Sequence, residues 1–185
     1  LVNGRMVKVK LSDGKFVQSK GKTGNDLVVE HQLQGALALE MQGKICDLTT
    51  TVSSDATILT FADKGGKEAF WHSSAHILAY AVSRLYPDAK PTIGPAIDEG
   101  FYYDFDDLEI TKDDFKKIQQ ECRKIIKEKL DINRNEISLA EAKKFFKKNK
   151  YKVELAEQAA EGGATLSTYS MGAFVDLCEG PHIPN

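Results

Sequence analysis

Cysteine is scarce in this chain of 185 residues, and its scarcity argues against two classes of small protein. Cys46, Cys122 and Cys178 form an odd set of three that contains no CxxC pair. Such a sparse set does not predict a disulfide framework, and we expect reduced thiols in an intracellular compartment. A structural zinc finger, which draws its ligands from paired cysteines, is not predicted either.

Long apolar runs are missing as well. No stretch approaches the roughly eighteen apolar residues of a membrane span, and the opening LVNGRMVKVKLSDG lacks the apolar region of a signal peptide. We therefore expect no membrane partner and a cytoplasmic location, with the mitochondrial matrix as the alternative. Hydrophobic residues make up 42% of the chain and charged residues 28%, which is ordinary for a soluble globular protein with a real core.

Charge is unevenly distributed along the chain. Six acidic residues and no basic ones lie between Asp98 and Glu109, whereas fourteen basic and seven acidic residues lie between Lys112 and Lys152. The basic segment predicts either a solvated helical face or a surface for a phosphate backbone, which needs Lys and Arg without fixed spacing. The net charge of −2 does not choose between these two interpretations.

The first sixty residues predict a small α+β module. Apolar residues alternate from Val7 to Leu11, SDG supplies a turn, and Phe16 begins the return strand of a hairpin. Asp26 is placed to cap a helix through LVVEHQLQGALALEM, with Gly43 just past its end. KICDL and ATILTF then have the composition of two short strands. A β-grasp (ubiquitin-like) arrangement would bury such a set.

The polar, Gly-rich stretch ADKGGKEA is predicted to link this module, residues 1–62, to a second one, residues 63–185. There, apolar residues recur at helical spacing from Trp71 to Leu85, and capping boxes at Thr111 and Ser138 open two more helices. We expect GFYYDF and DINRNEI to be strands, YKVEL a short extended piece, EQAAEGGAT a loop and TLSTYSMGAFVDLCEGPH a hairpin. The second module is therefore predicted to be α+β, with an antiparallel sheet and packed helices.

Two pairs of reactive side chains stand out, His72-x-x-x-His76 and Cys178-x-x-x-His182. Histidines four residues apart share one face of a helix, and together with the second pair they could hold zinc. A metalloprotease helix would carry Glu after its first His, where this chain has Ser73. Without metal, the same groups could transfer protons, or Cys178 could act as a nucleophile activated by His182. The remaining alternative is a helix with two hydrogen-bonded histidines beside the core.

Lys152 is the other candidate, between two segments of apolar character. An inward-pointing Lys152 could orient a water molecule or bind a phosphate. The alternative is one more surface lysine of the basic segment.

Two stretches, FWHSSAHILAYAVSRLYPDAKPTIGPAIDEGFYYDFD and YSMGAFVDLCEGPHIPN, closely resemble the N-terminal editing region of the threonyl-tRNA synthetase family. The first sixty residues resemble the TGS module of that family more loosely, since LALEMQGKICDL departs from the usual VNG turn. The family's editing domain continues beyond the Cys-x-x-x-His turn, and this chain has no initiator methionine. We therefore expect a fragment that lacks the C-terminal end of the editing domain and the ATP-binding aminoacylation domain, and that is monomeric.

The resemblance implies hydrolysis of Ser-tRNA(Thr), with water attacking the seryl ester at the 3′ aminoacyl-adenosine and serine as the product. It implies tRNA(Thr) and the rest of the synthetase chain as partners. No cofactor is expected, although zinc is possible at His72, His76, Cys178 and His182. Carried onto this sequence, the catalytic group is His72, His76, Lys152, Cys178 and His182, with Asp176 and Tyr103 binding the substrate.

Two other functions remain open. One is a zinc-dependent editing hydrolase of the alanyl type, in which the same four residues would bind the metal. The other is a tRNA-binding regulatory module without catalysis, for which the four residues would not be needed.

Overall fold

The computed structural model describes residues 5–185, and the chain divides into two compact units. The first unit comprises the residues up to Ser73 together with Gly180–Pro184, and the second comprises Ser74–Glu179 and Asn185. The predicted α+β class is confirmed, whereas the domain boundary between residues 62 and 63 remains a prediction. No helix in the described part of the chain has the length and apolar character to cross a membrane.

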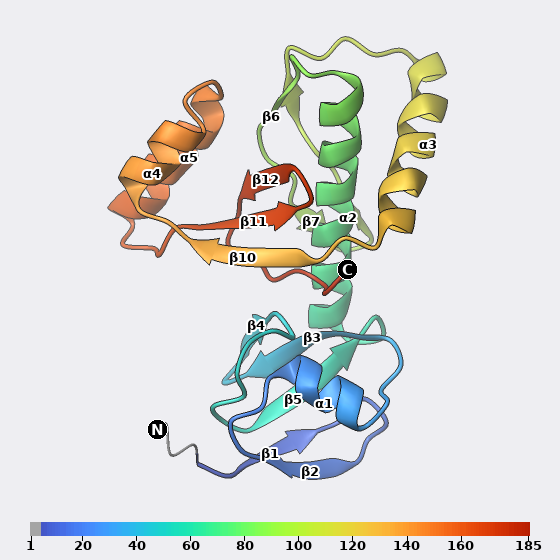
Figure 1. The fold of residues 1–185 in the computed structure, drawn as a ribbon, viewed down its shortest axis with the longest axis vertical. Coiled ribbons are helices and arrows are strands. Elements are labelled where there is room, and N and C mark those ends of the chain that lie inside the picture. The colour runs from blue at the N-terminus through green and yellow to red at the C-terminus, as the bar shows by residue number, and fades with distance from the viewer. Residues whose placement is uncertain (1–4) are drawn as a thin grey trace. The chain divides into compact units, whose positions relative to one another are not determined.

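A mixed five-stranded sheet forms the frame of the first unit (Figure 1). Its order is β2-β1-β5-β3-β4, and only the pairing of β1 with β5 is parallel. The predicted hairpin is confirmed, because alternate residues of β1 are buried and its partner β2 runs antiparallel. The strands are β1 (Val7–Lys10), β2 (Phe16–Ser19), β3 (Ala36–Met41), β4 (Lys44–Cys46) and β5 (Ala56–Thr60).

Helix α1 (Gly24–Glu30) is much shorter than predicted. Thr23 caps it, and its backbone N–H donates to the Asp26 carboxylate over 2.7 Å. The expected continuation to Met41 is wrong, because those residues form strand β3 between β5 and β4. Their helix-favouring composition is overridden by burial, since Ala38 and Leu39 have no exposed surface in the sheet.

Helix α2 (Lys64–Leu85) begins within the stretch that was predicted to be a linker, so that prediction is wrong. The glycines of ADKGGKEA serve close packing instead of flexibility. A Cβ atom at Gly66 would lie 2.0 Å from the carbonyl oxygen of Thr60 at the end of β5. Only glycine therefore allows the helix backbone to approach the sheet so closely.

Three small sheets lie in the second unit. Strands β10 (Ile132–Glu136), β11 (Ser167–Met171) and β12 (Phe174–Leu177) form an antiparallel sheet in that order, which confirms the predicted strand and hairpin. The single aromatic strand expected for GFYYDF is wrong, since that segment contributes to two pairs. They are β6 (Lys90–Pro91) with β9 (Phe105–Asp106), and β7 (Ala96–Ile97) with β8 (Gly100–Phe101).

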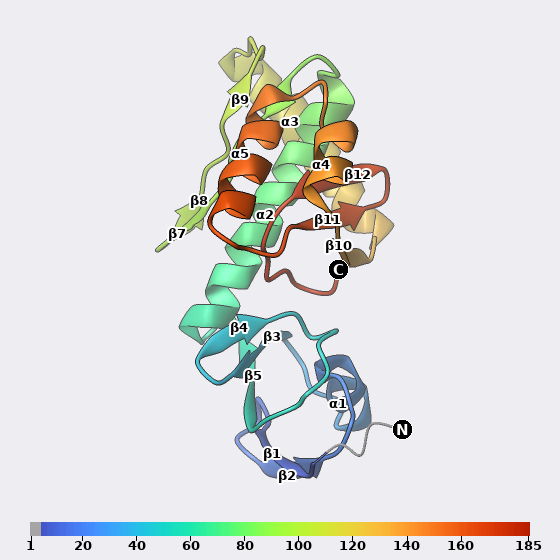
Figure 2. The same cartoon turned by 90° about the vertical axis from the view of Figure 1, so that its left-hand side faces the viewer.

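In Figure 1, helix α2 runs between α3 on one side and the α4–α5 pair on the other; in Figure 2, turned by 90°, the α4–α5 pair overlies α2. Arg84 ties α2 to α3 through both carboxylate oxygens of Glu128, at 2.7 and 2.8 Å. Ala142 and Ala156 form the contact between the other two helices. The bounds are α3 (Lys112–Glu128), α4 (Leu139–Phe145) and α5 (Lys150–Glu161).

The helix starts follow local side-chain chemistry. The predicted capping boxes at Thr111 and Ser138 are confirmed at the starts of α3 and α4. The extended piece predicted for YKVEL is wrong, as is most of the loop after it, because both lie in α5. The side-chain oxygen of Asn149 accepts the Lys152 backbone N–H over 3.3 Å and so starts this helix.

The cap of α3 predicts a pH dependence of stability. Hydrogen bonds from the Thr111 backbone, and further ones from Lys117 and Thr111, lower the pKa of Asp114 to about 2. A carboxyl group with a lowered pKa stabilises the fold above its ordinary pKa, and this contribution is lost as the pH falls toward 2. We expect Asp114→Asn to lower the melting temperature at pH 7 and to have no effect near pH 2. Thermal unfolding from pH 2 to 7 tests this; a pH-independent difference would contradict it.

Candidate functional site

Asp176 is the centre of a buried polar group in the second unit. It lies on β12 with 3% of its surface exposed. The Lys152 ammonium is 2.6 Å from its Oδ1 atom, and the Tyr103 hydroxyl donates to its Oδ2 atom over 2.6 Å. Nε2 of His76 lies 3.5 Å from the same Oδ2. One carboxylate thus connects side chains from a helix start, an aromatic segment and the long helix.

Local structure aims these side chains inward. Phe174 and Asp176 are buried while their neighbours on β12 are half-buried, as the alternation of a strand requires. Lys152 occupies the first turn of α5 and is 4% exposed, so the surface-lysine alternative is wrong. A buried ion pair contributes little net stability, because desolvation offsets its attraction. The pair of Lys152 and Asp176 is therefore better explained by chemistry than by folding.

The Tyr103 ring is held by its neighbours. It stacks on Phe105 with ring centroids 4.9 Å apart, and a Cβ atom at Gly94 would lie 2.1 Å from the ring. Burial, followed by the nearby Asp176 carboxylate, raises the pKa of Tyr103 far above its usual value. The phenol therefore keeps its proton and acts as a hydrogen-bond donor to Asp176.

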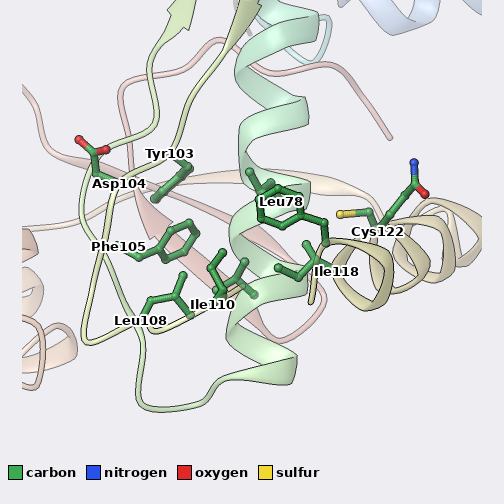
Figure 3. Close-up of a pocket in the computed structure, with 11 residues that line it drawn as sticks. Leu78, Tyr103, Asp104, Phe105, Leu108, Ile110, Ile118 and Cys122 are labelled. Atoms are coloured by element: carbon green, nitrogen blue, oxygen red, sulfur yellow. The ribbon is translucent and has the colours of Figure 1, made fainter. Parts of the chain in front are cut away.

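Tyr103 also borders a hollow of about 520 Å³ between α2, α3 and the segment that includes β9 (Figure 3). Its volume lies in the range of small-molecule pockets. The lining is mainly aliphatic and aromatic, so the hollow suits an apolar group better than a charged one. It is lined by Leu78, Val82, Tyr103, Asp104, Phe105, Leu108, Ile110, Phe115, Ile118, Gln119 and Cys122.

His72 and His182 lie together within the first unit. Their ring centroids are 4.3 Å apart with an interplanar angle of 32°. Ser73 Oγ lies 2.9 Å from Nδ1 of His182, and the backbone N–H of His182 donates to Oδ1 of Asp47 over 2.6 Å. His182 is buried, with 2% of its surface exposed. The Ser73 contact holds its ring, and the Asp47 contact holds its backbone.

The two histidines of helix α2 differ in burial. His72 is half-buried, whereas His76 is buried, with 5% of its surface exposed and its ring beside Asp176. Phe174 packs edge-on against the His76 ring, with ring centroids 5.9 Å apart, and helps to exclude water from it.

The four candidate zinc ligands are divided between the two units. His72 and His182 belong to the first unit, and His76 and Cys178 belong to the second. Imidazole nitrogens and a thiolate suit zinc in kind. The same side chains can equally well transfer protons and donate or accept hydrogen bonds.

The structure thus brings together six of the predicted residues around two contact groups. Lys152, Tyr103 and His76 surround Asp176, and His72 stacks with His182. Cys178 is held at the end of β12, where its backbone N–H donates to the Ser167 carbonyl over 3.1 Å. The roles assigned to these residues remain predictions.

Sequence reasoning missed Ser73 and Asp47 as partners of His182. In the sequence, Ser73 is distinctive only as the residue that replaces the Glu of a metalloprotease helix. Asp47 lies 135 residues from His182, and no spacing rule connects them. The only signal in the sequence for either partner is that Ser73 lies between the two candidate histidines His72 and His76.

Fold and side chains define an α+β protein with buried histidine, lysine and carboxylate groups and a half-buried cysteine that could bind a metal or transfer protons. No family model matches the chain. The sequence is, however, similar to curated threonine–tRNA ligases. It is 45% identical to the ligase of Desulfatibacillum aliphaticivorans over 97% of this chain and 29% of that protein. Identity to the ligase of Clostridium tetani is 45% over the same shares, and to that of Caldanaerobacter subterraneus 50% over 81% and 24%.

The chain therefore spans less than a third of the length of these relatives. Its similarity is to a part of threonine–tRNA ligases.

Proposed function

We propose that this chain is the N-terminal region of a cytoplasmic threonine–tRNA ligase and removes serine from Ser-tRNA(Thr). Residues 1–62 would be its TGS-like β-grasp domain and residues 63–185 its editing domain. The observation that carries the proposal is the convergence of Lys152, Tyr103 and His76 on the buried Asp176. The similarity to threonine–tRNA ligases supports it.

The chemistry of the substrate explains why such a site is needed. Serine is threonine without one methyl group, and a missing methyl changes binding by only about 1–3 kcal/mol, or roughly 10–200-fold. A pocket shaped for threonine therefore cannot exclude serine. A second site can sort by the opposite rule, admitting serine and rejecting the larger threonine by its size.

Asp176 would bind the α-amino group of the seryl ester. A carboxylate accepts about four hydrogen bonds. Lys152 occupies one position on Oδ1, while Tyr103 and His76 lie at Oδ2. Oδ1 can accept one further donor, and an ammonium group supplies that donor with the matching charge.

Lys152 and His72 would share the work on the attacking water. An ammonium group donates hydrogen bonds and accepts none, so Lys152 would orient the water or the ester carbonyl. A neutral imidazole can take the proton, and we assign that step to His72. The water oxygen then bonds to the carbonyl carbon, the ester C–O bond breaks, and the proton passes to the ribose oxygen that leaves. His76, Cys178 and His182 would line the pocket and hold the ribose and ester.

The test is deacylation of Ser-tRNA(Thr) beside Thr-tRNA(Thr). We expect the chain to cleave the serine ester and to spare the threonine ester. His76→Ala should slow cleavage about 100-fold, because a substrate that is no longer held in position can react about 10²-fold more slowly. His31→Ala, the same change at the remaining histidine, should leave the rate unchanged. A chain that cleaves neither ester but binds tRNA(Thr) as tightly as its His76→Ala variant would be a binding module.

Metal content separates the proposal from a zinc-dependent hydrolase of the alanyl type. The presence of three imidazoles and one thiol, the side-chain types that bind zinc, favours that second candidate. Because we assign proton transfer to His72, deacylation should persist after chelation with 1,10-phenanthroline and dialysis. Loss of activity that returns on adding one equivalent of zinc would establish the zinc enzyme instead.

A further inference from the structure

Ser73 makes three polar contacts although its side chain is completely buried. Its Oγ atom lies 2.9 Å from the carbonyl oxygen of Ala69, 2.9 Å from Nδ1 of His182 and 3.0 Å from the backbone nitrogen of Ile183. All four residues belong to the first unit. Together the three contacts constrain where the hydroxyl proton lies.

A serine hydroxyl has one proton and accepts two hydrogen bonds. The Ile183 backbone N–H can only donate, so it occupies one acceptor position of Ser73. The Ala69 carbonyl can only accept, so it receives the hydroxyl proton. What remains on Ser73 is one acceptor position, and it faces Nδ1 of His182.

With all three contacts made as hydrogen bonds, Nδ1 of His182 carries a proton. In the neutral ring, the lone pair is then on Nε2, because one imidazole nitrogen donates while the other accepts. Nε2 is therefore the nitrogen at which His182 can accept a hydrogen bond, since Nδ1 is engaged by Ser73.

The segment around His182 is anchored at two more points in the first unit. Its backbone N–H donates to Asp47 over 2.6 Å. The next side chain, Ile183, packs against the buried residues Ala38, Leu59 and Ala69. The ring thus has little room to turn over and exchange its two nitrogens.

We propose that Ser73 is a positioning residue that fixes His182 as a hydrogen-bond acceptor at Nε2. The partner that this chemistry fits is a hydroxyl donor, either the attacking water or a ribose hydroxyl. The role in hydrolysis rests on the proposed function, whereas the assignment of the proton to Nδ1 does not. A His182 ring with the opposite proton placement would offer Nε2 as a donor and could not accept that hydroxyl.

Proton–nitrogen correlation spectra of the imidazole rings measure the proton placement directly in the unaltered chain, with His182 assigned by a His182→Gln variant. We expect a protonated Nδ1 and an unprotonated Nε2. Ser73→Ala removes the acceptor and should shift His182 toward protonation at Nε2. Ser19→Ala is the matched control, because Ser19 is an equally buried serine of the same unit whose hydroxyl has no hydrogen-bond partner.

Deacylation of Ser-tRNA(Thr) gives the second measurement. Ser73→Ala should lower kcat about 10–100-fold, the usual effect of losing a group that orients an active-site histidine. Ser19→Ala should leave kcat unchanged. A wild-type His182 protonated at Nε2, or a Ser73→Ala variant with unchanged spectrum and kcat, would overturn the proposal. Spectra as expected in a chain without deacylation would overturn the proposed function and leave the proton assignment supported.

Discussion

Lys152→Met is expected to lower the free energy of unfolding by about 3–5 kcal/mol, the largest effect on stability that we predict for a single side chain. The reason is that the variant leaves the Asp176 carboxylate without its ion-pair partner. Asp176 has 3% of its surface exposed and would keep a buried charge without the ammonium now 2.6 Å away. Urea unfolding at pH 7, followed by circular dichroism, measures the change.

Two controls show whether the unpaired charge is the cause. In Lys152→Met with Asp176→Asn, both charges are gone, and we expect at least about 2 kcal/mol of the loss to return, because neutral replacements of a buried pair cost little. Lys150→Met alters an exposed lysine in the same turn of α5 and should stay within about 0.5 kcal/mol of wild type. A double variant as unstable as Lys152→Met would contradict the explanation. Both Lys152 variants should lack deacylation activity.

Gly94→Ala is expected to lower deacylation about 10–100-fold, although Gly94 contributes no functional group. Its new Cβ atom would lie 2.1 Å from Cδ2 and 2.4 Å from Cε2 of Tyr103. The ring must move, and its hydroxyl then loses the 2.6 Å contact with Asp176. Overpacking of this kind also costs about 1–3 kcal/mol of stability. Single-turnover deacylation and urea unfolding measure the two effects.

Gly162→Ala is the matched control for this prediction. Its Cβ atom would meet only two carbonyl oxygens at 3.5 Å, an ordinary contact, so stability should change by less than about 0.5 kcal/mol. Tyr103→Phe removes the hydroxyl without any clash and should lower deacylation as Gly94→Ala does. If Gly94→Ala is destabilised while both variants keep full activity, Tyr103 is only a wall of the site.

Local signals in the sequence predicted local structure well. The capping box at Ser138 and Glu141 is confirmed, because every atom that decides it lies within four residues. The segment after Gly35 was misassigned for the opposite reason. Ala, Leu, Glu and Met favour a helix, but the hydrogen bonds that β3 makes with β5 come from residues 56–60. Pairing between segments this far apart in the sequence cannot be recognised from a short stretch of neighbouring residues.

The same distinction between local and tertiary features applies to the residues of the candidate site. The spacing of His72 and His76 places them on one face of a helix, and this follows from the sequence alone. The burial of Lys152 does not, since a lysine in a basic segment looks like a surface residue until Asp176 is known to face it. The resemblance to a family indicated Lys152 and Asp176 separately, each with its own role, whereas the contact between them is a tertiary feature.

The contact between Asp47 and His182 has a consequence for how the chain is made. The two residues are 135 positions apart, so a ribosome adding about 5–20 residues per second makes the second roughly 7–27 s after the first. The five-stranded sheet is complete as soon as β5 has emerged, long before its last segment exists. A growing chain can therefore fold its first core early, while His182 and the chemistry that depends on it follow only after the second unit has been made.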